Sequence, residues 1–321
     1  MSTSRQLFTI PLRPIVGDRF QPTGFPNLGA AVYDRPVLDG GWERCLLVES
    51  EQSMANRLEA TMWDSPARRP IELIARLPHV RVVDEDGEFL TSSRLEAHRV
   101  ASAYIREGTV GDTTGVEVIN ERLGLDDDRQ RAPYEIADGL FSLDPMVLIH
   151  GVFLSHKDFP GQPKVARAIT AFIEAHDVRE VHGGGVKKDS VLTGQTEDRG
   201  STEGYGMVPF DRLEWTAREI VLNADIDLQQ LRSYGLAEPE IDLLADLARL
   251  ELRYLIEGGL RLRTACDLAL ATDRVVDHSG EELPSADALE DRVRRAIDGL
   301  AEVAGSITVT WGKKGKKGKK G

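Results

Sequence analysis

A strand that leads into a long helix, between residues 219 and 257, constrains the fold of this chain more than any other feature. In Glu219–Leu228 apolar and polar residues alternate, which is the period of a strand with one buried and one wet face. Glu240–Glu257 lies between Pro239 and Gly258, and its apolar residues recur at helical spacing. The pattern predicts a sheet with an amphipathic helix packed on one face.

A second strand and helix are expected near the N-terminus. Arg44–Glu49 is typical of a short buried strand, and Ser50 after it is a favourable helix N-cap. The predicted helix, Glu51–Trp63, has two different faces. Its apolar stripe is Met54, Ala55, Leu58 and Met62, and its hydrogen-bonding side is Gln52, Ser53, Asn56 and Arg57.

The middle of the chain predicts a strand, helix and strand in succession. Met146–Leu154 is interpreted as a strand, Pro163–His176 as an amphipathic helix, and Val178–His182 as the returning strand of a right-handed unit. Residues 183–206 are rich in Gly, Ser and Thr, so they are expected to project as a mobile loop or hairpin.

The remaining elements complete an α+β prediction. A polar helix is expected to start at Ser93, which has capping-box spacing to Glu96, and the segment Gly17–Gly41 is expected to be an ordered irregular loop. A helix over Ala286–Val303 and a strand over residues 307–311 follow. Strands that lead into amphipathic helices favour a sheet of ferredoxin-like or RRM type.

Composition and charge narrow the class of protein. The chain is 41% hydrophobic, which is typical of a folded protein, and no apolar run reaches the roughly 20 residues that cross a bilayer. Cys45 and Cys266 lack metal-site spacing, so buried thiols in a cytoplasmic protein without a membrane partner are expected. The net charge of −13 argues against a general nucleic-acid coat, although local positive potential is enough to hold a phosphate backbone.

Sequence signatures of catalysis are absent. The common nucleotide, zinc and hydrolase motifs do not occur, so no catalytic, cofactor or metal residue is predicted. The acidic triplet 126–128 could hold Mg²⁺ with Glu121, but solvated surface is the more frequent role of such a run. Three glycines before Lys187 and Lys188 resemble a nest of backbone N–H groups for phosphate, with a solvated loop as the alternative.

Three stretches together resemble one known family. They are RFQPTGFPNLGAAVYDRP (19–36), LLVESEQSMANRLEA (46–60) and GEFLTSSRLEAHRVAS (87–102), and the second is the most specific. The family is the repeating backbone subunit of type I-G CRISPR effector complexes, formerly called type I-U, which are Cascade assemblies. The resemblance continues weakly through VHGGGVKKDSV and EIVLNADIDL.

The resemblance implies a fold and a non-catalytic role. The implied fold is an RRM-derived palm with inserted fingers and a thumb. This predicts one domain over residues 1–311, with insertions at about 64–144 and 183–206, and a disordered lysine-rich tail over 312–321. The implied partners are guide RNA (crRNA), target DNA through the guide, copies of the same chain and other Cascade subunits.

Candidate RNA-binding residues follow from the matched stretches. Gln52, Ser53, Asn56 and Arg57 match the part of the motif that faces guide RNA, and Arg94 and His98 come from the third stretch. Lys187 and Lys188 are added as a loop that could face RNA.

Two alternatives stay open at the level of sequence. One is a metal-dependent RNA-cleaving backbone subunit of the type III kind, with Asp189 or Asp198 as the acidic residue. The other is a cytoplasmic protein that assembles with itself without nucleic acid, which the pI of 5.1 and the long irregular loops would suit.

Overall fold

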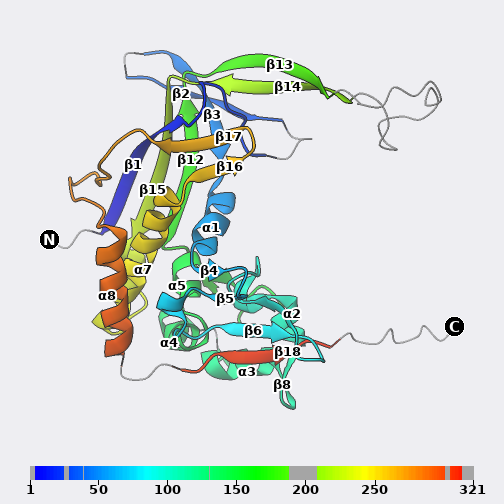
Figure 1. Cartoon of the computed structure of the whole chain (residues 1–321). Coiled ribbons are helices and arrows are strands. Elements are labelled where there is room, and N and C mark those ends of the chain that lie inside the picture. Colours follow the sequence, from blue (N-terminus) through cyan, green and yellow to red (C-terminus); the bar gives the residue numbers. More distant parts are fainter. Residues whose placement is uncertain are drawn as a thin grey trace, which may run out of the picture.

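A seven-stranded antiparallel sheet forms one half of the molecule (Figure 1). The computed structural model describes residues 4–24, 29–38, 40–129, 131–187, 208–300 and 304–312. The strand order is β16-β17-β1-β15-β12-β3-β2, and each neighbouring pair is antiparallel. The strands are β1 (Arg5–Pro14), β2 (Ala31–Pro36), β3 (Trp42–Glu49), β12 (Ile169–His176), β15 (Glu219–Asp227), β16 (Leu260–Arg263) and β17 (Cys266–Leu270).

Helices cover one face of this sheet and leave the other face polar. α1 (Glu51–Ala60) packs on β12, α7 (Glu238–Glu257) packs on β15 and α1, and α6 (Leu228–Arg232) and α8 (Ala286–Gly299) pack on α7. On the uncovered face, Arg5 pairs with Asp225 and Asp227 at 2.8 Å each. Asn223 donates to Glu174 at 3.1 Å on the same face. The predicted wet side of the 219–228 strand is therefore confirmed.

A second region, in the lower half of Figure 1, is built from short elements between α1 and β12. A five-stranded sheet there has the order β7-β6-β18-β8-β9, in which the C-terminal strand β18 pairs in parallel with β6. The elements are β4 (Trp63–Asp64), β5 (Arg69–Pro70), η1 (Glu72–Ile74), β6 (Val80–Val83), β7 (Phe89–Ser92), η2 (Arg99–Ala101), α2 (Ala103–Glu107), β8 (Thr109–Val110), β9 (Thr113–Thr114), α3 (Gly115–Leu123), α4 (Pro133–Leu143), α5 (Met146–His150), β10 (Val152–Phe153), β11 (Lys164–Val165) and β18 (Ile307–Thr310). This second region therefore depends on the end of the chain to complete its sheet.

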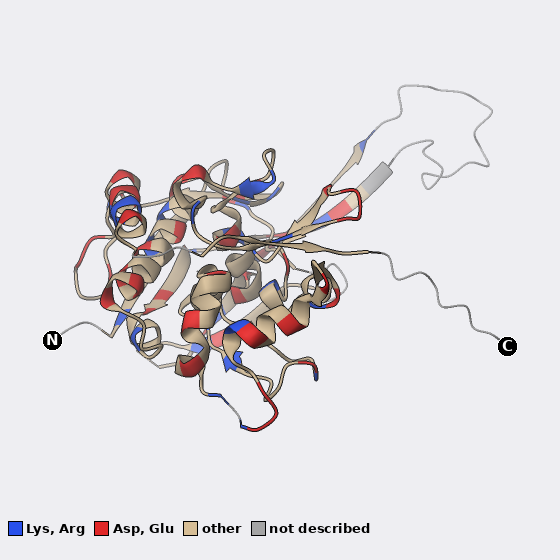
Figure 2. Cartoon of the chain, turned by 90° about the horizontal axis from the view of Figure 1, so that it is seen from below, with Lys and Arg blue, Asp and Glu red and all other residues tan. Residues whose placement is uncertain are grey.

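A long hairpin projects from the body (Figures 1 and 2). Its strands are β13 (Arg179–Lys187) and β14 (Val208–Thr216), which pair in antiparallel register from Arg179↔Thr216 to Lys187↔Val208. A hairpin is one of the two forms predicted for the interruption that starts at residue 183. The rest of that interruption, and the lysine-rich tail from residue 313, lie outside the described residues.

The predicted strand–helix–strand unit in the middle of the chain is wrong, although most of its last segment, Val178–His182, does lie in the strand β13. In the predicted strand Met146–Leu154, residues 146–150 instead form the helix α5. Only Val152 and Phe153 are in a strand, β10. The range expected to be a helix instead contains the strand β12, in which residues 169, 171, 173 and 175 are buried alternately. Apolar residues in this range satisfied the helical period, but the open edges of β15 and β3 require an extended neighbour.

Two further corrections concern the N-terminal third. No helix starts at Ser93, because its hydroxyl is buried, donates to Asp144 at 2.6 Å and accepts from the Val80 amide at 3.1 Å. The segment 17–41 is not wholly irregular, since β2 lies within it and pairs with β3.

The other elements confirm an α+β fold. Ser50 caps α1, and β3, α7, α8 and β18 lie where the sequence predicts them, within a few residues at their ends. Both cysteines are buried free thiols, as expected. None of the described helices is long and apolar enough to span a membrane.

Candidate functional site

A groove runs between α1 and the segment that precedes β2. Its volume is about 560 Å³, and three of the predicted residues of α1, Gln52, Ser53 and Asn56, line it. The facing wall is Thr23, Gly24, Gly29 and Ala31, with Leu47 of β3 and Ser50 at the end. Two of the three stretches that carried the family resemblance therefore meet at one surface.

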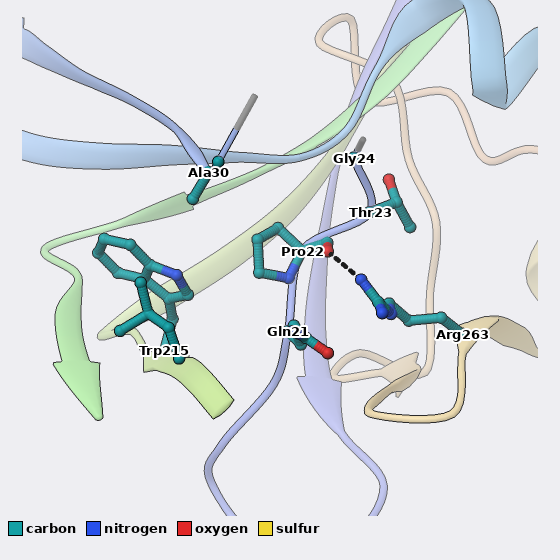
Figure 3. Close-up of a pocket in the computed structure, with 9 residues that line it drawn as sticks. Gln21, Pro22, Thr23, Gly24, Ala30, Trp215 and Arg263 are labelled. Atoms are coloured by element: carbon teal, nitrogen blue, oxygen red, sulfur yellow. Dashed lines mark hydrogen bonds between the residues drawn. The ribbon is translucent and has the colours of Figure 1, made fainter. Parts of the chain in front are cut away.

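The groove continues into a second hollow beside the β14 and β16 strands, shown in Figure 3. This hollow has a volume of about 280 Å³ and shares Thr23, Gly24 and Gly29 with the first. Trp215 and Arg263 also line it, on opposite sides of Pro22, and Arg263 Nη1 donates to the Pro22 carbonyl at 3.0 Å. The combined surface is a channel that presents hydroxyl and amide side chains, glycines and Arg263 together with the apolar residues Leu47, Leu213 and Trp215.

Hydrogen bonds organise the polar face of α1. The Ser50 hydroxyl accepts from the Ser53 amide at 3.4 Å and so satisfies one free N–H of the first turn. Gln52 Nε2 donates to Asn56 Oδ1 at 3.3 Å, one helical turn along. Gln52 Oε1 in turn accepts from Arg167 Nη2 at 2.6 Å.

Sequence reasoning missed Arg167. It lies in the short link between β11 and β12, inside the range that was predicted to be a helix. It contacts α1 from 115 positions away in sequence, and no local pattern marks that contact. Only the packing of α1 on β12 brings the two together.

Arg57 lies away from the groove, although it shares the helix with Gln52 and Asn56. Its Nη2 donates to the Leu262 carbonyl of β16 at 2.8 Å, and its Nε lies 3.4 Å from Glu49 Oε1. Glu49 is fully buried, so Arg57 places a positive charge beside a carboxylate that has no contact with water. The structure thus gives Arg57 a role in fastening α1 to β16.

The third stretch, residues 87–102, contacts α1 through Arg99. Arg94 is only 6% exposed and is committed to Asp144 at 3.2 Å and to the Pro78 carbonyl at 3.1 Å, so the geometry offers no surface contact for it. His98 is exposed, on the turn before η2. Arg99, which sequence reasoning did not single out, forms a two-bond ion pair with Glu59 of α1 at 2.8 and 3.0 Å.

The hairpin does not form the predicted phosphate nest. Gly183, Gly184 and Gly185 are extended residues of β13 and pair with β14, so their N–H groups do not converge on one point. Lys187 is exposed at the end of the strand, whereas Lys188 lies outside the described residues.

A buried acid and histidine lie beneath the C-terminal end of α1. His150 Nε2 and Glu251 Oε1 are 2.9 Å apart, and both side chains are fully buried. Burial raises the pKa of Glu251. Burial alone would lower the pKa of His150, but the Glu251 carboxyl outweighs it and the pKa is raised. These groups lie in the core and line no groove.

The described residues hold no cluster of three or more His, Cys, Asp or Glu side chains arranged for a metal ion. Asp126 of the acidic triplet is hydrogen-bonded to Arg131 at 2.7 Å, and this bond lowers the pKa of the carboxyl. Asp189 and Asp198, the acidic candidates of the type III alternative, lie outside the described residues.

Comparisons with known proteins add two findings. A family model described as "CRISPR-associated protein GSU0053" matches residues 7–180, which is more than half of the chain. A solved structure titled "CRISPR RNA-guided surveillance complex, pre-nicking" is similar over 78% of this chain and 67% of that chain, with 16% identity and a TM-score of 0.34. The comparison with curated proteins found no match.

Proposed function

Because this chain belongs to the CRISPR-associated protein GSU0053 family, we propose that it is the guide-RNA-binding backbone subunit of a type I-G Cascade complex. In this role, copies of the chain assemble along one crRNA and hold it through its backbone, with other Cascade subunits at the ends. In this proposal the bases stay free to pair with target DNA, and the protein itself carries out no catalysis.

The groove beside α1 is the observation that carries this proposal. Its polar wall consists of uncharged amide and hydroxyl side chains, Gln52, Ser53 and Asn56, which hydrogen-bond phosphate and ribose oxygens without reading sequence. Its facing wall includes Gly24 and Gly29, which leave room for a backbone to approach closely. These residues come from the two N-terminal stretches, and both lie inside the part of the chain that matches the family.

The electrostatics of the sheet favour the groove over the uncovered face. An RRM binds RNA on its open sheet through stacked aromatic residues. Here that face carries Glu174, Asp225 and Asp227, and Arg5 neutralises only part of their charge, so the remaining negative charge would repel a phosphate backbone. Figure 2 shows acidic and basic segments interspersed over the body, so binding needs a local site such as the groove.

Strand order supports assigning a ferredoxin-like palm to the large sheet. The four strands β17-β1-β15-β12 are neighbours in the sheet. Along the chain they occur as β1, then α1, β12, β15, α7 and β17, which is a β-α-β-β-α-β succession. In this proposal the β2–β3 pair extends the palm, and the region between α1 and β12 is its large insertion.

The β13–β14 hairpin is the arm we assign to contacts between successive copies. It projects from the body, and Val186 and Phe210 on it are 53% and 48% exposed. Large apolar side chains on a projecting hairpin favour burial against a partner surface.

The test is co-expression with the partner subunits and a CRISPR array, followed by purification and a denaturing gel of the bound nucleic acid. We expect a discrete guide-sized RNA to co-purify with the wild-type chain. The amount of RNA should fall in the double variant Gln52→Ala, Asn56→Ala and stay unchanged in Arg295→Ala, which lies on the distant helix α8. Absence of RNA from the intact assembly would contradict the proposal. Metal-dependent cleavage of complementary RNA by the same preparation would instead favour the type III alternative.

A further inference from the structure

We propose that Arg167, Gln52 and Asn56 form one oriented array of hydrogen-bond donors that binds phosphate oxygens of the RNA backbone, with Arg167 as its cation. This inference rests on the proposed function and names the residues that grip the RNA. Arg167 matched none of the sequence motifs. In this inference Arg167 is the cation that contacts RNA, in place of Arg57 and Arg94, which the sequence predicted.

Arg167 fixes which atoms of the array donate hydrogen bonds and which accept them. A guanidinium can only donate, so Gln52 must accept with Oε1, at 2.6 Å from Arg167 Nη2. This orientation leaves Gln52 Nε2 as a donor, and it donates to Asn56 Oδ1 at 3.3 Å. Each amide oxygen is therefore used within the array, and the Asn56 amide nitrogen is left with its hydrogens.

The groups left over for a ligand are therefore donors. Asn56 is exposed on the groove wall, and Arg167 has N–H groups beyond the two that bond Gln52 and the Glu51 carbonyl. A surface of donors matches a ligand made of acceptors, and the phosphodiester backbone presents charged oxygen acceptors at every nucleotide.

Among the described residues, no carboxylate forms an ion pair with Arg167, whose two hydrogen bonds go to the uncharged oxygens of the Glu51 carbonyl and the Gln52 side chain. The two other arginines bound to α1 differ in this respect, because Arg57 pairs with Glu49 and Arg99 with Glu59. Burial, and then the charge of Arg99, lower the pKa of Arg167, and Glu59 and Glu51 offset this only in part because neither is a counterion in direct contact with the guanidinium. A bound phosphate would supply that counterion.

The backbone beside Arg167 is held firmly, which favours a preorganised site. The next residue, Ala168, donates its amide to the Ile149 carbonyl at 2.8 Å and accepts from the Asp227 amide at 2.7 Å. These bonds connect the link to α5 on one side and to the end of β15 on the other. The guanidinium therefore reaches α1 from a fixed base, and less freedom is lost when a ligand binds.

The experiment measures binding of the full chain to a fluorescein-labelled single-stranded RNA by anisotropy at several salt concentrations. Arg167→Ala and Asn56→Asp are compared with Arg295→Ala, which removes the same charge as Arg167→Ala from an exposed site on α8. Asn56→Asp keeps the acceptor for Gln52 and nearly the same shape, but replaces the donor with a negative charge. Equal melting temperatures confirm that the variants are folded.

We expect Arg167→Ala and Asn56→Asp each to weaken binding by about tenfold or more, as for loss of a charge-assisted hydrogen bond or addition of a repulsive charge. Arg167→Ala should also reduce the slope of log affinity against log salt by about 0.7, the value for one phosphate contact on a single strand. Asn56→Ala should bind better than Asn56→Asp, because it removes the donor without adding repulsion.

Two results would overturn the inference in distinguishable ways. If the wild-type chain binds RNA and both variants stay within about twofold of Arg295→Ala, the array is not the site, and the proposed function stands. If the wild-type chain and the assembled complex carry no RNA, the proposed function fails and this inference fails with it.

Discussion

Replacing Arg99 tests whether the third stretch holds α1 in place. Arg99 forms two hydrogen bonds to Glu59 of α1, and the two side chains are 10% and 16% exposed. Removing one partner of a buried pair costs about 3 to 5 kcal/mol, because the other charge is left without a counterion. Here the stranded Glu59 would also add to the negative charge near the fully buried Glu251.

The pair keeps some solvent contact, so we expect the lower end of that range, about 3 kcal/mol for Arg99→Ala. In a chain of 321 residues, this corresponds to a fall of roughly 4 to 5 °C in Tm. The assay is denaturant unfolding followed by circular dichroism, with thermal melting alongside. Arg76→Ala is the matched control, since it breaks an ion pair with Asp298 whose side chains are 62% and 61% exposed, and it should cost less than about 1 kcal/mol.

A double replacement separates the stranded charge from lost packing. Glu59→Leu with Arg99→Met removes both charges and keeps most of the volume, so it should recover most of the stability lost in Arg99→Ala. The reasoning is refuted if Arg99→Ala costs no more than Arg76→Ala, or if the double variant is less stable than the single one.

Three further predictions follow from the core. Glu251 raises the pKa of His150, so protonated His150 stabilises the fold below the unfolded pKa of about 6.5, and this stability is lost as pH rises through the pKa of His150 in the folded protein. Denaturant titrations from about pH 6 to 9 should show the free energy of unfolding falling, and His150→Gln should make that free energy less dependent on pH. Met54→Ala should lower the free energy of unfolding by about 3 kcal/mol in the same titrations, because Met54 lies on the fully buried side of α1. A loss below about 1 kcal/mol would contradict the burial of this side chain in the core. Gly139→Ala should lower Tm where the exposed Asp138→Ala does not, because a Cβ at Gly139 would lie 2.4 Å from the Arg122 carbonyl oxygen.

Local sequence determined the elements whose pattern and packing agree. Ser50 predicted the start of α1, and alternation predicted β15 with its buried and wet faces. The 240–257 stripe predicted α7, whose apolar residues are almost wholly buried. In each case the period of the apolar residues matches only one kind of element, and tertiary packing favours the same element.

Pattern failed where two periods fitted the same residues. In the 163–176 range a helical stripe and an alternating strand share Ile169 and Ile173, and the sheet decided between them. Ser93 had the spacing of a capping box, but its hydroxyl bonds a carboxylate 51 residues away. Side-chain partners of this kind depend on packing and leave no local trace.

The candidate site divides in the same way. Sequence alone determined that α1 has a polar face with Gln52, Ser53 and Asn56, because 100° per residue places them together. Only the tertiary structure decided that Arg57 turns toward Glu49, that Arg94 is buried, and that Arg167 completes the face. The physical reason is range: helical periodicity acts over a few residues, whereas the charge of Arg167 reaches Gln52 only after β12 has paired into the sheet and α1 has packed against it.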